Sequence, residues 1–110
     1  MSSGRILSVE SSCDETAVAI VEGGRRIVAN VVASQVQLHS ATGGIVPEVA
    51  ARAHLRWMIP VLEEARSRAR IDDWRQVDAV AVTEGPGLAG SLLVGITMAK
   101  TLAWSLGLPL

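Results

Sequence analysis

The first apolar stretch decides the fold: residues 6–21 read Ile-Leu-Ser-Val-Glu-Ser-Ser-Cys-Asp-Glu-Thr-Ala-Val-Ala-Ile-Val. Residues 6–12 are typical of a buried strand, and residues 16–21, rich in small and β-branched side chains, are typical of a second. The pair Gly23-Gly24 signals a tight turn, after which residues 26–33 resume the strand pattern. The opening of the chain therefore predicts a three-stranded antiparallel meander.

Downstream of the meander the pattern changes to helices. Residues 35–44 are polar and contain a glycine pair, which predicts a loop. Proline favours the first position of a helix, so a helix is expected from Pro47 to about Ala69. Pro60 lies inside this segment and removes one backbone hydrogen bond, which predicts either a kink or two abutting helices.

The last third of the chain predicts one more strand and one more helix. Asp72 is expected to cap a short helical turn before the apolar residues 79–83, which are typical of a buried parallel strand. Residues 88–106 are long enough for a helix, and Gly107 suits the position that follows a helix end. The order β-β-β-α-β-α is that of an α/β fold and of the opening of a ribonuclease H-like sheet, although other α+β domains share it.

Composition excludes several classes of protein. The 110 residues are 49% hydrophobic and 19% charged, which is too apolar for a disordered chain. A net charge of −1 gives no overall attraction to nucleic acid or anionic lipid. The single cysteine, Cys13, excludes an internal disulfide framework and suits a reducing, cytoplasmic location. No secretory signal is visible, and the apolar residues 106–110 suggest a piece cut from a longer protein.

Residues 88–108 are nearly as apolar as a membrane span. Lys100 is their single charge and lies well inside the segment, where it would cost about 2.5–3.5 kcal/mol on insertion. A buried helix of a soluble domain is therefore favoured over a membrane span.

The cluster Ser11-Ser12-Cys13-Asp14-Glu15-Thr16 is expected at the turn between the first two strands. Hydroxyls and turn N–H groups bind phosphate oxygens, and carboxylates hold a hydrated cation, so the cluster suits a phosphate or metal-water site. A turn that merely closes the hairpin explains the same residues. Cys13 is expected to be a small packed residue.

A second candidate is the glycine-rich loop of residues 84–91, where Gly85 and Gly87 would let the backbone approach a phosphate before a helix N-terminus. A plain turn fits the loop equally well. The only histidines are too isolated for a metal site. His39 lies in the expected polar loop and is a candidate for substrate contact, whereas His54 is expected to be a surface or partner contact.

A local basic stretch of arginines runs from the long helix onward. It is either a solvated helix face, which is favoured, or a surface that faces RNA. Its members are Arg52, Arg56, Arg66, Arg68, Arg70 and Arg75.

Three ordered segments resemble a single family: ILSVESSCDETA at 6–17, HSATGGIVPEVA at 39–50 and GPGLAGSLLVG at 85–95. This is the universal tRNA threonylcarbamoyladenosine synthase family, long described as O-sialoglycoprotein endopeptidase or glycoprotease. The resemblance covers essentially the whole chain as an N-terminal fragment, residues 1–110, of the first lobe. No Ser/His/Asp or zinc-protease spacing supports the older protease description.

The resemblance implies an actin-like ATPase lobe and a cytoplasmic enzyme that acts on tRNA. The full protein would transfer a threonylcarbamoyl group from threonylcarbamoyl-adenylate to N6 of the adenosine next to the anticodon. Asp14 would face the phosphates or a catalytic water, with Glu15 beside it, and Ser11, Ser12, Gly85 and Gly87 would border the cleft. His39 and Glu48 become candidates for proximity to the substrate.

The family also uses a divalent metal (iron or zinc) and an adenine nucleotide. Its signature passes through Lys100-Thr101 and 106–110 to a later pair of metal-binding histidines, so no metal site is expected in this chain.

The alternative is a non-catalytic scaffold paralogue of the same fold that pairs with the enzyme. That subfamily shares Gly85-Pro86-Gly87 but lacks the Cys13-Asp14-Glu15 run, so the enzyme is favoured. The resemblance implies pairing through the first two helices of the lobe. The long helix at 47–69 is apolar on more than one face, so Met58 and Leu62 are expected to be exposed in a self-associating interface.

Overall fold

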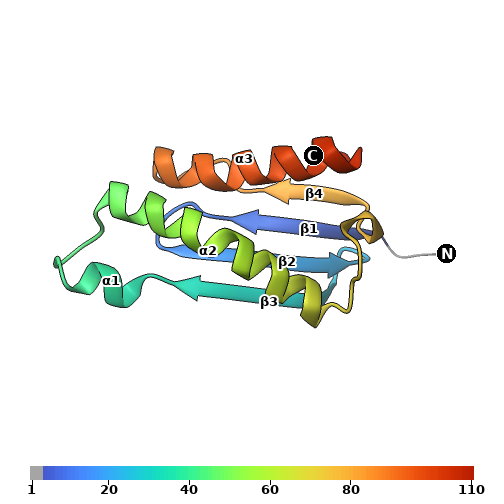
Figure 1. Cartoon of the computed structure of the whole chain (residues 1–110), viewed down its shortest axis with the longest axis horizontal. Coiled ribbons are helices and arrows are strands. Elements are labelled where there is room, and N and C mark those ends of the chain that lie inside the picture. The colour runs from blue at the N-terminus through green and yellow to red at the C-terminus, as the bar shows by residue number, and fades with distance from the viewer. Residues whose placement is uncertain (1–3) are drawn as a thin grey trace.

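The computed structural model describes residues 4–110 as a four-stranded sheet covered on one face by helices. The strand order is β3-β2-β1-β4, as Figure 1 shows. The strands are β1 (Arg5–Glu10), β2 (Glu15–Glu22), β3 (Arg26–Ser34) and β4 (Ala79–Val82). β1, β2 and β3 pair antiparallel, and β4 pairs parallel with β1. The predicted meander and parallel strand are therefore confirmed, and with them the expected ribonuclease H-like opening of an actin-like lobe.

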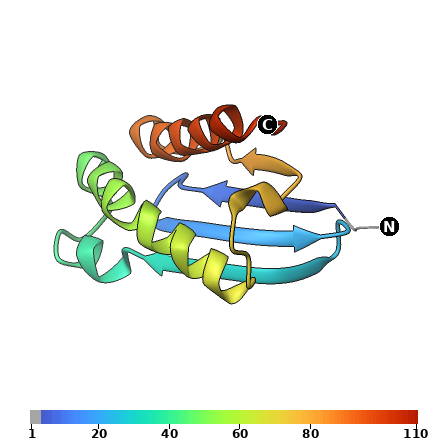
Figure 2. The ribbon, with the colours of Figure 1, turned by 45° about the vertical axis from the view of Figure 1, so that its right-hand side comes forward.

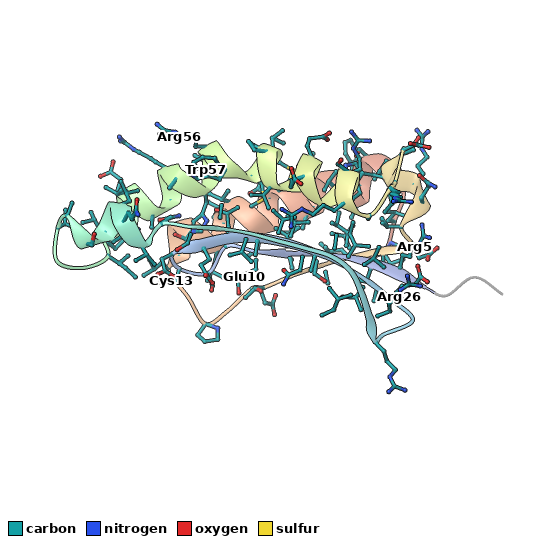
Figure 3. All side chains as sticks on the ribbon, turned by 90° about the horizontal axis from the view of Figure 1, so that it is seen from below. Arg5, Glu10, Cys13, Arg26, Arg56 and Trp57 are labelled. Atoms are coloured by element: carbon teal, nitrogen blue, oxygen red, sulfur yellow. The ribbon has the colours of Figure 1, made fainter. Side chains whose placement is uncertain are left out.

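The helical elements are α1 (Val36–Ser40), α2 (Pro47–Arg68), the 3₁₀ turn η1 (Trp74–Gln76) and α3 (Ala89–Leu106). α2 and α3 lie side by side over the same face of the sheet (Figure 3). η1 and its flanking loops carry the chain from the end of α2 back to β4 (Figure 2). The predicted long helices are confirmed, and Gly107 follows α3 in a left-handed conformation as expected, with φ 67°.

The alternation of side chains along the strands builds the core. Leu7 and Val9 of β1 and Val18 and Ile20 of β2 point toward the helices and are at most 1% exposed. The residues between them face the other side of the sheet, which no element covers among residues 4–110. Because a sheet buries every second residue, this two-layer arrangement follows directly from the period-two pattern.

Three local predictions differ from the structure. Residues 36–40 are not loop but form the short helix α1, because Gln35 and His39 are buried and hydrogen-bond to each other across its single turn. Asp73, not Asp72, caps η1, in a reciprocal capping box with Gln76. Of the two alternatives for Pro60, a kink or two abutting helices, the second is excluded, because α2 is one continuous helix; Pro60 lies on its exposed side.

The predicted exposure of Met58 and Leu62 is wrong. They are only 1% and 3% exposed and belong to the core between α2 and the sheet. The expectation of a second apolar surface on α2 is nevertheless confirmed, because Leu55 is 66% and Ile59 is 54% exposed. In the sequence, the large apolar residues of this exposed face are of the same type as those of the core, so residue type alone did not distinguish the two faces.

The expected buried helix α3 is buried along one row, and its other faces are exposed. Gly95 and Ala99 lie in the buried row, whereas Trp104 is 88% exposed. By length and composition α3 is the one helix among the described residues that could cross a membrane. In the structure it packs on α2, β1 and β4.

Candidate functional site

The acidic turn, residues Ser11–Thr16, follows β1 and opens β2. Its backbone carbonyls are held by three separate parts of the chain. Ser12 O accepts from the Leu88 N–H at 2.8 Å, and Asp14 O accepts from the Gln35 N–H at 2.9 Å. Cys13 O, between them, accepts from His54 Nε2 at 2.9 Å. The turn is therefore far more constrained than a loop that only closes a hairpin.

His54 is completely buried beneath this turn, which makes its predicted surface position wrong. Its Nδ1 lies 2.8 Å from the hydroxyl of Thr16, and its Nε2 bonds Cys13 O. A carbonyl oxygen only accepts, so Nε2 carries the proton and Nδ1 accepts from Thr16. One imidazole on α2 thus holds both ends of a four-residue segment.

Ser11 joins the acidic turn to α3. Its hydroxyl donates to Ser91 O at 2.6 Å and accepts from the Gly95 N–H at 3.0 Å. A side chain at Gly95 would meet that hydroxyl, since an added Cβ would lie 2.5 Å from Ser11 Oγ. Ser11 is 1% exposed and its hydroxyl is committed to the helix, so its predicted contact with a ligand is wrong.

The glycine-rich loop lies directly against the acidic turn. An added Cβ at Gly87 would lie 2.6 Å from Ser12 O, so the close approach of the two backbones requires glycine there. A Cβ at Gly85 would meet nothing within 4 Å, so packing does not explain that glycine. The structure thus brings Ser12 and Gly87 together, as a shared phosphate site would need.

Several polar groups remain free where the turn and the loop meet. Asp14 is half-buried and Glu15 is exposed. The N–H groups of Cys13 and Asp14 donate to no residue of the described chain. In a trans peptide the N–H points away from the carbonyl. Because Ser12 O and Cys13 O are anchored to the protein, the N–H groups that follow them are directed away from those anchors and are available to a ligand.

The start of α3 adds further donors beside the same loop. Its N-cap, Leu88, has no side chain that can cap the helix, so the first N–H groups of α3 have no side-chain cap. Ser91, in this first turn, is fully buried and its Oγ has no partner among the described residues. Free N–H groups and the positive end of the helix dipole favour an anion at this position.

Two predicted substrate contacts lie elsewhere. His39 is buried in α1, so its predicted place in a polar loop is wrong; its Nε2 lies 2.7 Å from Gln35 Oε1. The Gln35 amide nitrogen donates to Ala50 O, which leaves its oxygen as the acceptor for His39. Glu48 is exposed in the first turn of α2 and pairs with Arg52 at 2.7 Å. Neither side chain contacts the acidic turn.

No group of three His, Cys, Asp or Glu residues within the described chain, 4–110, is arranged to hold a metal ion. Both ring nitrogens of His54 already form hydrogen bonds within the protein, so His54 is not available as a metal ligand. Cys13, the free thiol, is half-exposed rather than packed away as predicted.

The arginine run is largely neutralised by neighbouring carboxylates. Arg66 and Arg68 pair with Glu63 and Glu64 at 2.7 and 2.9 Å. The hydrogen bond that Arg66 donates to the Glu63 carboxylate raises the pKa of Arg66. Pairing of this kind is typical of a solvated helix face, the interpretation that the sequence favoured.

A separate apolar feature, the α2–α3 groove, lies between the two long helices on the outer side of the molecule. It has a volume of about 400 Å³, and its sides carry the exposed Leu55, Ile59 and Leu93. Met58 contributes to its floor. An apolar groove flanked by large exposed side chains is typical of a protein contact surface.

Sequence reasoning missed the contributions of His54, Thr16 and Gln35. A signal for His54 was present: it lies four residues from Ala50 and from Met58, on the row of α2 that faces the sheet. No pattern in the sequence indicates that a buried histidine on this row would reach a carbonyl 41 residues earlier in the chain.

Comparison with known proteins places the chain in a family. Residues 26–110 match the family model of TsaD, tRNA N6-adenosine threonylcarbamoyltransferase. The chain is 56% identical over 110 residues to the protein of that name from Symbiobacterium thermophilum, covering 100% of this chain and 32% of the relative. The Moorella thermoacetica protein of the same name is 55% identical over 105 residues, covering 96% of this chain and 30% of the relative. The chain thus spans about a third of the length of these curated relatives.

Solved structures support the fold. YeaZ from Pseudomonas aeruginosa superposes with a TM-score of 0.69 at 21% identity, over 97% of this chain and 42% of that one. At this identity the likeness concerns the fold alone. The matched family model and the relatives together show that the chain belongs to the tRNA N6-adenosine threonylcarbamoyltransferase family.

Proposed function

We propose that this chain forms the N-terminal part of a cytoplasmic enzyme that transfers a threonylcarbamoyl group from threonylcarbamoyl-adenylate to N6 of the adenosine next to the tRNA anticodon. The observation that carries the proposal is the acidic turn, which holds two carboxylates and two free N–H groups and packs through Ser12 against the glycine-rich loop and the start of α3. Groups that can donate hydrogen bonds to a phosphate lie in the same turn as carboxylates, as transfer from an adenylate requires.

The transfer forms a bond between N6 and the carbamoyl carbon and breaks the bond from that carbon to the phosphate oxygen. Adenosine monophosphate leaves, and N6 loses one proton. We assign the free N–H groups of Cys13 and Asp14 to the phosphate, where they would stabilise the charge on the leaving group. Asp14 and Glu15 are the carboxylates beside that phosphate and would receive the proton through water.

The resemblance implies an adenine nucleotide and a divalent metal, iron or zinc. The nucleotide phosphates fit the donors just described. The metal fits no set of residues in the described chain, so no step is assigned to it here. His39 and Glu48 remain predictions as residues near the substrate, and their side chains contact α1 and α2 rather than the acidic turn.

The decisive experiment uses a protein in which this chain is continued to the length of its relatives. Asp14→Asn should lower kcat by about 10²-fold or more, because the carboxylate charge is lost while its shape is kept. The melting temperature should stay within a few degrees. Glu63→Gln, which removes an exposed carboxylate on α2, is the matched control and should change neither value. An Asp14→Asn enzyme with the wild-type rate would reduce the turn to a structural role.

The 110-residue chain by itself is expected to make no modified tRNA, because the metal site and most of the nucleotide site would lie outside it. Incubation with threonylcarbamoyl-adenylate and unmodified tRNA tests this. Product above a control without protein would show that the described residues suffice for transfer.

We propose that the α2–α3 groove receives a scaffold paralogue of the same fold, and that this chain alone self-associates there instead. The exposed Leu55 and Leu93 support this, since they leave apolar surface uncovered on two packed helices. An interface of this kind would bury at least about 1,000 Å² in total. The contact residues replace Met58 and Leu62 of the sequence-based prediction.

The scaffold alternative for this chain itself predicts a protein that pairs with the enzyme but carries no turnover. The Cys13-Asp14-Glu15 run supports the enzyme, because a scaffold has no use for two carboxylates held beside free N–H groups. Turnover by the extended protein without any added paralogue distinguishes the two, since a scaffold alone would give none.

A further inference from the structure

We infer that His54 is a positioning residue of the acidic turn: through its bonds to Cys13 and Thr16 it fixes the peptide that presents Asp14. This inference rests on the proposed function for its consequence in catalysis, but its geometry stands on the structure alone. His54 cannot touch a substrate, because it is fully buried beneath the turn.

The imidazole acts at both ends of the segment. Nε2–H donates to Cys13 O at 2.9 Å, and Nδ1 accepts from Thr16 Oγ1 at 2.8 Å. Thr16 is itself fully buried as part of β2, so it is a rigid reference point. The ring therefore connects the Cys13 carbonyl of the turn both to strand β2, through Thr16, and to helix α2, which carries His54.

The bond to Cys13 O sets the orientation of Asp14. The Cys13 carbonyl and the Asp14 N–H belong to one planar peptide and point in opposite directions. Drawing the carbonyl inward to His54 directs the Asp14 N–H away from α2 and places the Asp14 side chain half-exposed beside it. Release of the carbonyl would let this peptide rotate, and the N–H and the carboxylate would move together.

His54 is the one polar side chain in the buried row of α2. The other buried residues of α2 are all apolar: Ala50, Ala53, Met58, Val61, Leu62 and Ala65. A leucine would fill comparable space and favour the helix, but it would leave Cys13 O and the Thr16 hydroxyl without this partner. The side chain that α2 carries instead is the one whose two nitrogens match the two polar groups of the turn.

The first test compares three variants in the protein extended to the length of its relatives. His54→Leu removes both hydrogen bonds, and His54→Gln keeps one donor and one acceptor. Val61→Ala, in the same buried row, destabilises the core without touching the turn. His54→Leu should lower kcat by about 10²-fold, as expected for a displaced reacting group, with KM for tRNA changed by less than about threefold. His54→Gln should recover at least tenfold of that loss, and Val61→Ala should keep the wild-type kcat despite a lower melting temperature.

A second test needs no activity and uses the 110-residue chain. Backbone NMR order parameters of Cys13 and Asp14 should be near 0.85 in the wild type and in His54→Gln. In His54→Leu they should fall below about 0.6, while those of β2 stay unchanged.

These measurements separate the inference from the proposed function. A wild-type protein that makes no product would overturn the proposed function, and the order parameters would still judge the role of His54. Unchanged order parameters in His54→Leu, or a kcat loss that Val61→Ala reproduces, would overturn the inference and leave the proposed function standing.

Discussion

The acidic turn and the α2–α3 groove both depend on the same two helices, but they differ in how far their groups have partners within this chain. In the turn, Ser11, Ser12, Cys13 and Asp14 each have a carbonyl or hydroxyl bonded to another element of this chain. In the groove, Leu55 and Leu93 are 66% and 62% exposed. One region is held by internal polar contacts, whereas the other leaves apolar surface in water.

The difference shows which contacts this chain completes alone. Polar groups in the turn are directional, so each needs a partner at one position, and the chain supplies those partners. Apolar burial is proportional to area, so the groove needs a large second surface, which this chain does not provide. The turn is therefore expected to keep its geometry in the isolated chain, and the groove to be the place where other protein binds.

The largest expected effect distinguishes the core beneath the groove from the sides of the groove. Met58→Glu with Leu62→Glu should abolish cooperative unfolding, because both positions are buried in the core. The cost of burying two carboxylates there would exceed a free energy of unfolding of only about 5–15 kcal/mol. Leu55→Glu with Leu93→Glu should give a folded monomer. Circular dichroism melting and analytical sedimentation measure the two outcomes. A wild-type chain that sediments as a monomer at micromolar concentration would remove the self-association, and a normal melt of the first variant would return Met58 and Leu62 to the surface.

A smaller effect tests how tightly the turn is joined to α3. Gly95→Ala should cost about 1–3 kcal/mol, because the new Cβ would lie 2.5 Å from Ser11 Oγ. Ser11→Ala should cost about 1 kcal/mol for its hydrogen bonds. In the double variant the clash is gone, so its urea stability should be close to that of Ser11→Ala alone. Simple additivity of the two losses would show that the helix and the turn are not in direct contact.

The two buried histidines provide a comparison within the polar network. His54→Leu should cost about 2–4 kcal/mol, since it leaves Cys13 O and the Thr16 hydroxyl unpaired. His39→Leu should cost less, because the loss of its one bond to Gln35 Oε1 is partly offset by the removal of Nδ1, a buried atom without a partner among the described residues. Urea denaturation of both variants measures this. Equal losses would mean that His39 Nδ1 is satisfied.

The smallest expected effect lies at the far end of α2, away from both regions. Arg70 follows the helix with φ 56°, in the left-handed region that favours glycine. Arg70→Gly should therefore stabilise the chain by about 0.5–1 kcal/mol, whereas Ser67→Gly, inside the last turn of α2, should destabilise it slightly. Thermal denaturation compares the two. A loss of stability in Arg70→Gly would show that the arginine side chain holds the helix end.

The candidate site was predictable in part from its residue types. Asp14, Glu15, Ser12 and Gly87 were chosen because carboxylates, hydroxyls and glycines of these kinds bind phosphates, and the structure places Ser12 against Gly87. Ser11 was assigned to a ligand for the same reason, but its hydroxyl bonds α3. A hydroxyl that binds phosphate and one that binds a helix look the same in a sequence, because only the position of the partner separates them.

The sequence by itself determined the meander, the parallel strand, the two long helices and the family. Periodicity, turn residues and helix-end signals are local, so they act before distant segments meet. Tertiary structure alone decided that His54 lies under the acidic turn, that Met58 and Leu62 are core residues and that Leu55 and Leu93 are exposed. The physical reason is that a helix with more than one apolar face could bury any one of those faces. The sheet selects the face, and whichever residues that face carries become the core.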